Sequence, residues 1–310
     1  MHNRRDFLQK AFGAAAFVGL SGIPYDLFAK KEIAKITILH TNDVHSHIDP
    51  FPDNDPKYPG MGGVARRAEI IRKIRQEEKN VLLLDAGDVF QGTPYFNQYG
   101  GELELKLMSM MGYDAGTIGN HDFDNGLEGF SKMFPFAQFP FINCNYDFNN
   151  TPLKGKTLPY KVFVKDDIRI GVFGIGIELE GLVGKKNYGD TVYLDPLAKA
   201  AEYTHLLKHE EKCDLVICLS HLGFRYDDKK VSDMVLAKKS KNIDLIIGGH
   251  THTFLDKPAV ILNRDGQQCL VAQVGWAGIK LGRVDFYFEK NSRKKSYESA
   301  SVKISNCAIG

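Results

Sequence analysis

Short apolar runs alternate with longer amphipathic segments along the chain from Ile33 onward. The run at 36–39 is rich in β-branched residues and predicts a strand. The run at 81–84 is apolar on both faces, as expected of a strand in a sheet that is covered on both sides. Further buried strands are predicted at 168–173, 215–219 and 243–247.

Segments with helical periodicity lie between these runs. In residues 63–79, apolar side chains recur at Val64, Ala68, Ile71 and Ile74, with charged residues between them. This spacing predicts an amphipathic helix. Further helices are predicted at 102–111, at 197–211 and around 228–239.

The tail of the chain has a different pattern. Residues 259–304 contain β-rich runs and turn residues such as those at 263–266, and they show no helical periodicity. Strands that alternate with helices and are followed by more strands predict an α/β sandwich. We expect one catalytic domain over residues 30–310.

The N-terminus has the layout of an export signal. Arg4 and Arg5 are followed by Phe7-Leu8 and by an uncharged apolar run at 11–20. This layout resembles a twin-arginine signal, which directs folded proteins to the bacterial periplasm. An ordinary helix start or a membrane anchor is the alternative, although the run is shorter than the roughly 20 residues that cross a bilayer. We expect a signal segment at 1–29 and a periplasmic protein, tethered to the membrane only if the signal is not cleaved.

The charge balance of the chain bears on whether it binds nucleic acids. Lys plus Arg number 40 against 38 Asp plus Glu, which gives a net charge of +2. A chain that binds nucleic-acid polymers usually carries a strongly basic face, so no such partner is expected. The basic run at 293–295 is interpreted as a solvated turn.

The cysteines show neither CxxC spacing nor an even count. The spacing therefore indicates neither a zinc knuckle nor a dithiol redox motif. We expect buried free thiols, and a disulfide stays open for a protein outside the cytoplasm. The cysteines are Cys144, Cys213, Cys218, Cys269 and Cys307.

Metal-ligand residue types recur directly after the predicted strands and strand-like runs. The carboxyl ends of strands in open α/β sheets are where ligands bind, so these side chains are expected to converge on one site. Glycines beside them are expected to supply positive φ and a close backbone approach. The candidates are Asp43, His45, Asp88, Asn120, His221, His250 and His252.

The mixture of ligand types indicates the kind of centre. Carboxylate, imidazole and amide oxygen together suit manganese, iron or zinc. Seven candidates exceed the needs of one ion and serve two ions that share a bridging carboxylate. Taken alone, Asp43-x-His45 would more often be a turn and His221 a structural histidine. Their joint occurrence, each behind a strand-like run, favours the metal centre.

The series of motifs resembles the calcineurin-like metallophosphoesterase superfamily, whose pattern is D-x-H, G-D, G-N-H-[ED], H and G-H-x-H. Within it, the segments at 39–45, 62–66, 87–94 and 120–124 resemble the bacterial 5′-nucleotidase branch. The similarity covers roughly residues 33–290. It implies an α/β sandwich of two mixed β-sheets flanked by helices.

The resemblance also implies a role for each motif residue. Asp43, His45 and His252 would hold one divalent ion, and Asn120, His221 and His250 a second. Asp88 would bridge ions about 3.5–4 Å apart, which bind the phosphoryl group and the attacking hydroxide. Manganese or zinc is expected first, and iron is possible.

His121 follows a ligand but is not one in the family pattern. Its implied role is to stabilise charge on the phosphoryl oxygens or to protonate the leaving oxygen. Asp124 would orient it, and a helix N-cap is the alternative for Asp124. His40 and His47 match no ligand position and are interpreted as supporting residues.

One departure from the family concerns the substrate. Longer 5′-nucleotidases continue into a C-terminal domain whose aromatic residues stack on the nucleobase, whereas this chain stops at Gly310. We expect a small, nucleotide-like phosphate ester, recognised by loops such as 49–59 or with a separate chain supplying the missing domain. Of Phe254 and Trp276, one is expected to pack in the core, so discrimination among nucleotides should be poor.

Two other functions stay open at this point. One is a non-catalytic, exported metal- or ligand-binding protein of the same fold, which would need neither His121 nor Asp124. The other is hydrolysis of a non-phosphate ester, such as a sulfate thioester, which normally requires a carrier protein.

Overall fold

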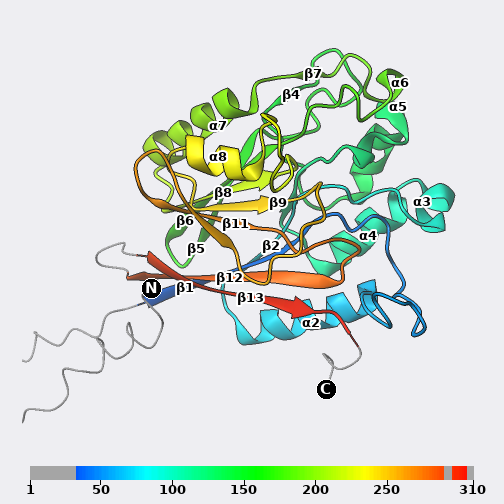
Figure 1. Ribbon diagram of the computed structural model, residues 1–310, viewed down its shortest axis with the longest axis horizontal. Coiled ribbons are helices and arrows are strands. Elements are labelled where there is room, and N and C mark those ends of the chain that lie inside the picture. The colour runs from blue at the N-terminus through cyan, green and yellow to red at the C-terminus, as the bar shows by residue number, and fades with distance from the viewer. Residues whose placement is uncertain (1–32, 290–294, 306–310) are drawn as a thin grey trace, which may run out of the picture.

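Two β-sheets form the centre of the protein in the computed structural model, which describes residues 33–289 and 295–305 (Figure 1). The predicted signal segment, Cys307 and most of the basic run at 293–295 lie outside these residues. The first sheet has the order β13-β12-β1-β2-β3 and the second the order β10-β11-β9-β8-β6-β5. A small ribbon joins β4 to β7.

The strands of the first sheet are β1 (Ile33–Thr41), β2 (Val81–Asp85), β3 (Ala115–Gly116), β12 (Lys280–Glu289) and β13 (Lys295–Lys303). Those of the second are β5 (Tyr160–Lys165), β6 (Ile168–Ile175), β8 (Leu215–Ser220), β9 (Leu245–Gly248), β10 (Ala259–Leu262) and β11 (Gln268–Ala272). The ribbon consists of β4 (Tyr146–Asp147) and β7 (Val192–Tyr193).

Both sheets are mixed, which confirms the fold class predicted from the sequence. In the first sheet β1, β2 and β3 are parallel, and β12 and β13 are antiparallel to their neighbours. In the second, β6, β8, β9 and β11 are parallel, and β5 and β10 pair antiparallel at the edges. The two-residue strands β3, β4 and β7 had no clear sequence signal.

The alternation of side chains along the strands explains why they are apolar on both faces. On β2, Leu82 and Leu84 belong to the cluster that fills the space between the sheets, together with residues such as Ile217 of β8. Leu83 belongs to a different cluster that includes Ile71 of the first long helix. Each central strand therefore buries one face against the other sheet and one against helices.

Helices cover the outer faces of the two sheets. The α-helices are α2 (Val64–Glu77), α3 (Pro94–Tyr99), α4 (Glu102–Met111), α5 (Gly126–Met133), α6 (Lys185–Tyr188), α7 (Pro196–His205) and α8 (Asp233–Lys239). In Figure 1, α2 lies along the five-stranded sheet, and α7 and α8 lie over the six-stranded sheet. In the described part of the chain, no helix is long and apolar enough to span a bilayer.

The predicted helix boundaries differ from the structure at two places. The segment predicted at 197–211 is α-helical only to His205 and continues as the π-helical turn η4 (Leu206–Glu210). The helix predicted around 228–239 begins at Asp233, because the Ser232 hydroxyl accepts the backbone N–H of Val235 and caps the helix there.

The cysteines of the described residues are free and buried, as predicted for Cys144, Cys213, Cys218 and Cys269. Burial raises the pKa of Cys213 to about 11, so the thiolate form that reacts or binds metal is suppressed at neutral pH.

Candidate metal centre

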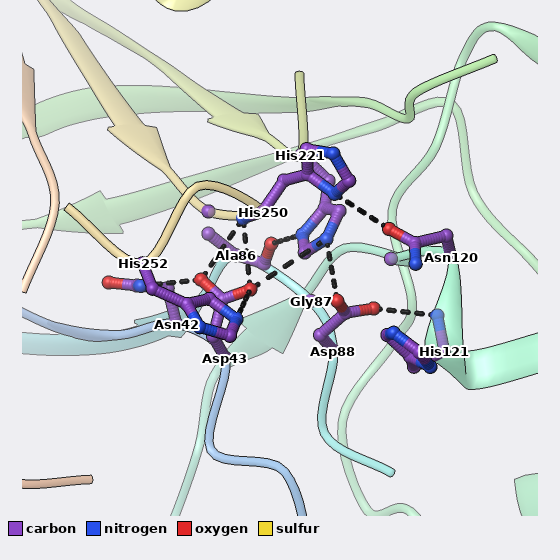
Figure 2. Close-up of polar contacts among 12 residues, drawn as sticks. Asn42, Asp43, Ala86, Gly87, Asp88, Asn120, His121, His221, His250 and His252 are labelled. Atoms are coloured by element: carbon purple, nitrogen blue, oxygen red, sulfur yellow. Dashed lines mark hydrogen bonds and ion pairs between the residues drawn. The ribbon is translucent and has the colours of Figure 1, made fainter. Parts of the chain in front are cut away.

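The loops that follow the central strands bring the predicted ligands into one region, and Figure 2 labels all of them except His45. Two groups of metal-ligand side chains form there, and the ligand atoms within each group lie within 4.8 Å of one another. The first group is Asp43, His45 and His252, and the second is Asp88, His221 and His250. All six residues are among the seven ligands predicted from the sequence.

The backbone of the ligand loops is unusual. The left-handed region, which non-glycine residues rarely occupy, holds Asp43 (φ 49°), His45 (φ 50°), Asp88 (φ 54°), His250 (φ 70°) and His252 (φ 51°). Such conformations cost free energy and are concentrated at functional sites.

The expectation that the glycines beside the ligands would supply positive φ holds for Gly87 but not for Gly119, Gly248 or Gly249. At Gly249 the reason for glycine is space, because an added Cβ would lie 2.7 Å from His221 Nδ1. At Gly119 an added Cβ would collide with the Asp88 carboxylate. Most of the left-handed turns are made by the candidate ligands themselves.

In the first group, two imidazole nitrogens face each other. His45 Nδ1–H donates to the carbonyl oxygens of Phe90 and Gln91 at 3.3 and 3.2 Å, which leaves the Nε2 lone pair free. That Nε2 lies 3.0 Å from His252 Nε2. Asp43 Oδ1 lies 3.5 Å from His252 Nε2. One carboxylate oxygen and two imidazole nitrogens that converge in this way fit a divalent cation such as manganese or zinc.

In the second group, His221 is oriented from behind. Its Nδ1–H donates to the carbonyl oxygen of Ala86 at 2.6 Å, a contact typical of ligating histidines. Its buried Nε2 has no hydrogen-bond partner, although Asp88 Oδ2 lies 3.0 Å away. Burial disfavours protonation of His221, but the charges of Asp88 and Asp43 outweigh it and raise the pKa to about 10. The buried carboxylates Asp88 and Asp43 therefore favour positive charge at this position, as a bound cation would provide.

Asp88 lies between the two groups. Its Oδ2 is 3.0 Å from His221 Nε2 in the second group and 3.8 Å from His45 Nε2 in the first. Its Oδ1 accepts the backbone N–H of His121 at 2.8 Å. This is the placement expected of a bridging carboxylate.

Asn120 lies beside the second group, as Figure 2 shows. Its side-chain oxygen accepts the Nδ1–H of His250 at 2.8 Å. The backbone N–H of His250 in turn donates to Asp43 Oδ1 at 2.9 Å. The seven predicted ligands therefore form one connected cluster.

His121 and Asp124 form a pair at the open side of the cluster. His121 Nδ1 lies 2.9 Å from Asp124 Oδ2, and the histidine side chain is 40% exposed. This hydrogen bond to Asp124 raises the pKa of His121. The N-cap alternative for Asp124 is wrong, because α5 is preceded by Asn125 at the cap position and Asp124 contacts the imidazole instead.

Asp122 supports two of the ligand loops, and its role was not predicted. Its buried carboxylate accepts the backbone N–H of Gly119 at 2.8 Å and of Val89 at 3.0 Å. Burial and the charge of Asp88 raise the pKa of Asp122 to about 7. Asp122 thereby joins the loop after β2 to the loop after β3. The only signal in the sequence was an acidic residue within the G-N-H-D motif that has no ligand role.

The supporting histidines differ from each other. His40 is fully enclosed, and burial lowers its pKa to about 4, so it is a neutral residue of the first sheet. His47 is partly exposed, and its ring stacks on Phe51 at a centroid distance of 5.3 Å.

A family profile described as calcineurin-like phosphoesterase matches residues 36–254. The chain belongs to the calcineurin-like phosphoesterase family. Members of this family use divalent metal ions, and the two ligand groups are the positions where this chain would hold them.

The relatives are nucleotide-cleaving enzymes by name. The trifunctional nucleotide phosphoesterase protein YfkN of Bacillus subtilis is 36% identical over 287 aligned residues, which cover 82% of this chain and 18% of YfkN. The snake venom 5′-nucleotidase of Naja atra is 34% identical, over 84% of this chain and 51% of that protein. A solved 5′-nucleotidase precursor from Thermus thermophilus is 31% identical with a TM-score of 0.80, and 89% of this chain aligns with 55% of that one. The chain spans about half the length of these 5′-nucleotidases.

Proposed function

We propose that this family member hydrolyses phosphate monoesters or diesters of nucleotide type, with two divalent ions as cofactors. The observation that carries the proposal is the pair of adjacent ligand groups with Asp88 between them and the His121–Asp124 pair alongside. The 5′-nucleotidase relatives support the choice of substrate class.

The site residues divide into metal ligands and a proton donor. Asp43, His45 and His252 would hold one ion, Asn120, His221 and His250 the other, and Asp88 would contact both. Two such ions polarise the phosphoryl group and lower the pKa of water. The imidazole-rich ligand set favours manganese or zinc, with iron as a further candidate.

His121 would act on the leaving group. Because Nδ1 is engaged by Asp124, the proton available for donation is on Nε2. That proton would pass to the leaving oxygen of the ester, and Asp124 would position the ring and favour its charged form. A protein that only stores metal would need neither residue, so this pair favours the enzyme over the binding protein.

A panel of substrates tests the proposal. Purified protein would be assayed on nucleoside mono-, di- and triphosphates, 2′,3′-cyclic nucleotides, a UDP-sugar and an aryl phosphate, each with manganese, zinc or magnesium. We expect hydrolysis that a chelator abolishes and that added manganese or zinc restores. Failure of every ester with every metal would contradict the proposal, and cleavage of a sulfate thioester alone would replace it.

A partner chain that adds a nucleotide-binding domain belongs to the same proposal. Adding such a chain should lower KM for nucleotides and leave the turnover of an aryl phosphate unaffected, because remote binding energy acts only on substrates that have the remote group.

Export to the periplasm is likewise proposed, from Arg4 and Arg5. Changing both to lysine should leave precursor in the cytoplasm, because the twin-arginine receptor recognises the arginine pair and not charge alone. The measurement is cell fractionation followed by immunoblotting. The control is Lys10→Arg, which conserves charge outside the arginine pair and should leave export unchanged. Normal export of the double-lysine protein would indicate the general secretory route.

A further inference from the structure

An aromatic cluster adjoins the first ligand group. We define it as Phe51, Tyr58, Phe254 and Trp276, which come from three segments of the chain, with Phe51 and Tyr58 on one loop. The Trp276 ring is parallel to that of the ligand-group residue His252, with an interplanar angle of 3° and a centroid distance of 5.7 Å. The rings of the cluster therefore begin directly beside the metal centre.

The cluster extends outward from Trp276. Phe51 lies 5.9 Å and Tyr58 6.3 Å from Trp276 by ring centroids. Tyr58 is also 6.1 Å from Phe254, which is 37% exposed. The other three rings are partly exposed. The prediction that Phe254 or Trp276 packs in the core is therefore wrong, because neither ring is buried.

Backbone hydrogen bonds hold the loop that carries Phe51 and Tyr58 in place. The N–H of Phe51 donates to the carbonyl oxygen of Met61 at 2.8 Å. The N–H of Tyr58 donates to Asp55 Oδ1 at 2.6 Å. These contacts hold the backbone of Phe51 and Tyr58 without any ligand, which lowers the entropic cost of presenting their rings to one.

The segments that carry Phe254 and Trp276 are tied to the ligand loops. Asn42 donates from Nδ2 to both Asp43 Oδ2 and the carbonyl oxygen of Gly275, each at 2.6 Å. At Gly275 (φ 81°) an added Cβ would collide with the ring of Phe254. Asn42 therefore ties the backbone next to Trp276 to Asp43, and the ring of Phe254 packs against Gly275 of the same segment.

We propose that the aromatic cluster stacks against the nucleobase of a substrate whose phosphate lies at the metal centre. This assignment rests on the proposed function, and it names a base-binding surface within the catalytic domain. Partly exposed aromatic rings are stacking platforms for bases, and stacking strengthens binding about fivefold to a hundredfold per base. Every base has a π-face, so the cluster selects nucleotides over esters without a base and discriminates little among bases.

The protein provides its own probe for this proposal. Trp276 is the single tryptophan of the chain, so all tryptophan fluorescence comes from the cluster. Adenosine and AMP, titrated into the full chain with excitation outside adenine absorption, should change this fluorescence saturably. Ribose 5-phosphate, which lacks a base, should not. No catalysis is required, so this result is independent of whether the protein hydrolyses phosphate esters.

Variants separate stacking from structural support. Phe254→Ala and Tyr58→Ala should each lower the ratio of kcat/KM for AMP to that for ribose 5-phosphate by about fivefold to a hundredfold. Phe254→Leu keeps an apolar side chain but removes the π-face, and it should behave like Phe254→Ala. The matched control is Phe163→Ala on β5. Phe163 pairs with Ile170 of β6, whereas the ligand residue His221 contacts the other end of that strand, at Ile175. This variant should leave the ratio of kcat/KM values unchanged.

The outcomes distinguish this proposal from the function it rests on. Hydrolysis of both substrates with an unchanged ratio in all the cluster variants would overturn the base site, as would the absence of any fluorescence response to adenosine and AMP. Adenosine binding by a protein that hydrolyses no ester would support the base site and remove the proposed function. Equal losses for AMP and ribose 5-phosphate would overturn the base site and assign the cluster a purely structural role.

Discussion

Replacing Asp88 by Asn is expected to lower kcat/KM about a thousandfold or more and to reduce the bound metal from about two ions per chain toward one or none. The Asp88 carboxylate is within 3.8 Å of an imidazole nitrogen from each ligand group, so both positions lose negative charge together. Metal ions contribute several kcal/mol of transition-state stabilisation, and about 4 kcal/mol corresponds to a thousandfold in rate. Metal analysis by mass spectrometry and steady-state kinetics would measure the two effects.

The control is Asp190→Asn, which removes one carboxylate from an exposed position. It should retain both the metal and the activity. An Asp88→Asn protein with full activity and two bound ions would disprove the two-metal centre. Asp88 also accepts the backbone N–H of His121, so the substitution removes a structural contact as well as a ligand. Circular dichroism would therefore be used to check that the Asp88→Asn protein is folded.

The second large effect is expected for His121→Asn. Loss of a general acid typically lowers the rate about 10²- to 10⁴-fold. We expect a loss of about this size for a nucleotide and a smaller one for an aryl phosphate, whose leaving oxygen needs little protonation. Bound metal should be unchanged, which separates this variant from Asp88→Asn. Equal losses for both leaving groups would remove His121 from the role of acid.

The pH dependence of the reaction tests the partner of His121. The hydrogen bond to Asp124 raises the pKa of His121, so the protonated ring persists to higher pH than an isolated imidazole. Activity that needs this proton is complete below the raised pKa and is lost as the pH rises through it. In Asp124→Asn the loss should therefore occur at lower pH than in the wild type. Superimposable profiles would show that Asp124 does not act through His121.

The sequence was enough to predict where the candidate ligands meet, because their signal is local. Most of the motifs sit at the end of an apolar run, as with Asp88 after β2 and His221 after β8. Parallel neighbouring strands end at the same edge of a sheet, so position along the chain sufficed to bring Asp43 and Asp88 together, after β1 and β2 of the first sheet. The contact between Asp88 and His221 depends in addition on how the two sheets stack, because β2 and β8 belong to different sheets.

Other features depend on contacts that no local pattern encodes. The path of the 49–60 loop decides that Phe51 and Tyr58 meet Trp276, which lies far along the chain. The left-handed conformation of His252 (φ 51°) could not be predicted from the sequence, because non-glycine residues adopt positive φ in only a few per cent of cases. Two-residue strands such as β3 are too short for any periodicity to be read.

The position of the ligand groups at the junction of the two sheets has a mechanical consequence. His45 follows β1 of one sheet and His252 follows β9 of the other, and the two imidazole nitrogens meet although the residues are 207 positions apart. The layer between the sheets is apolar, and the hydrophobic effect that holds it together is not directional. A cation held by residues of both sheets would act as a cross-link between them, much as a disulfide closes a long loop. An ion that takes part in catalysis would thus also fix the five-stranded and six-stranded sheets relative to each other.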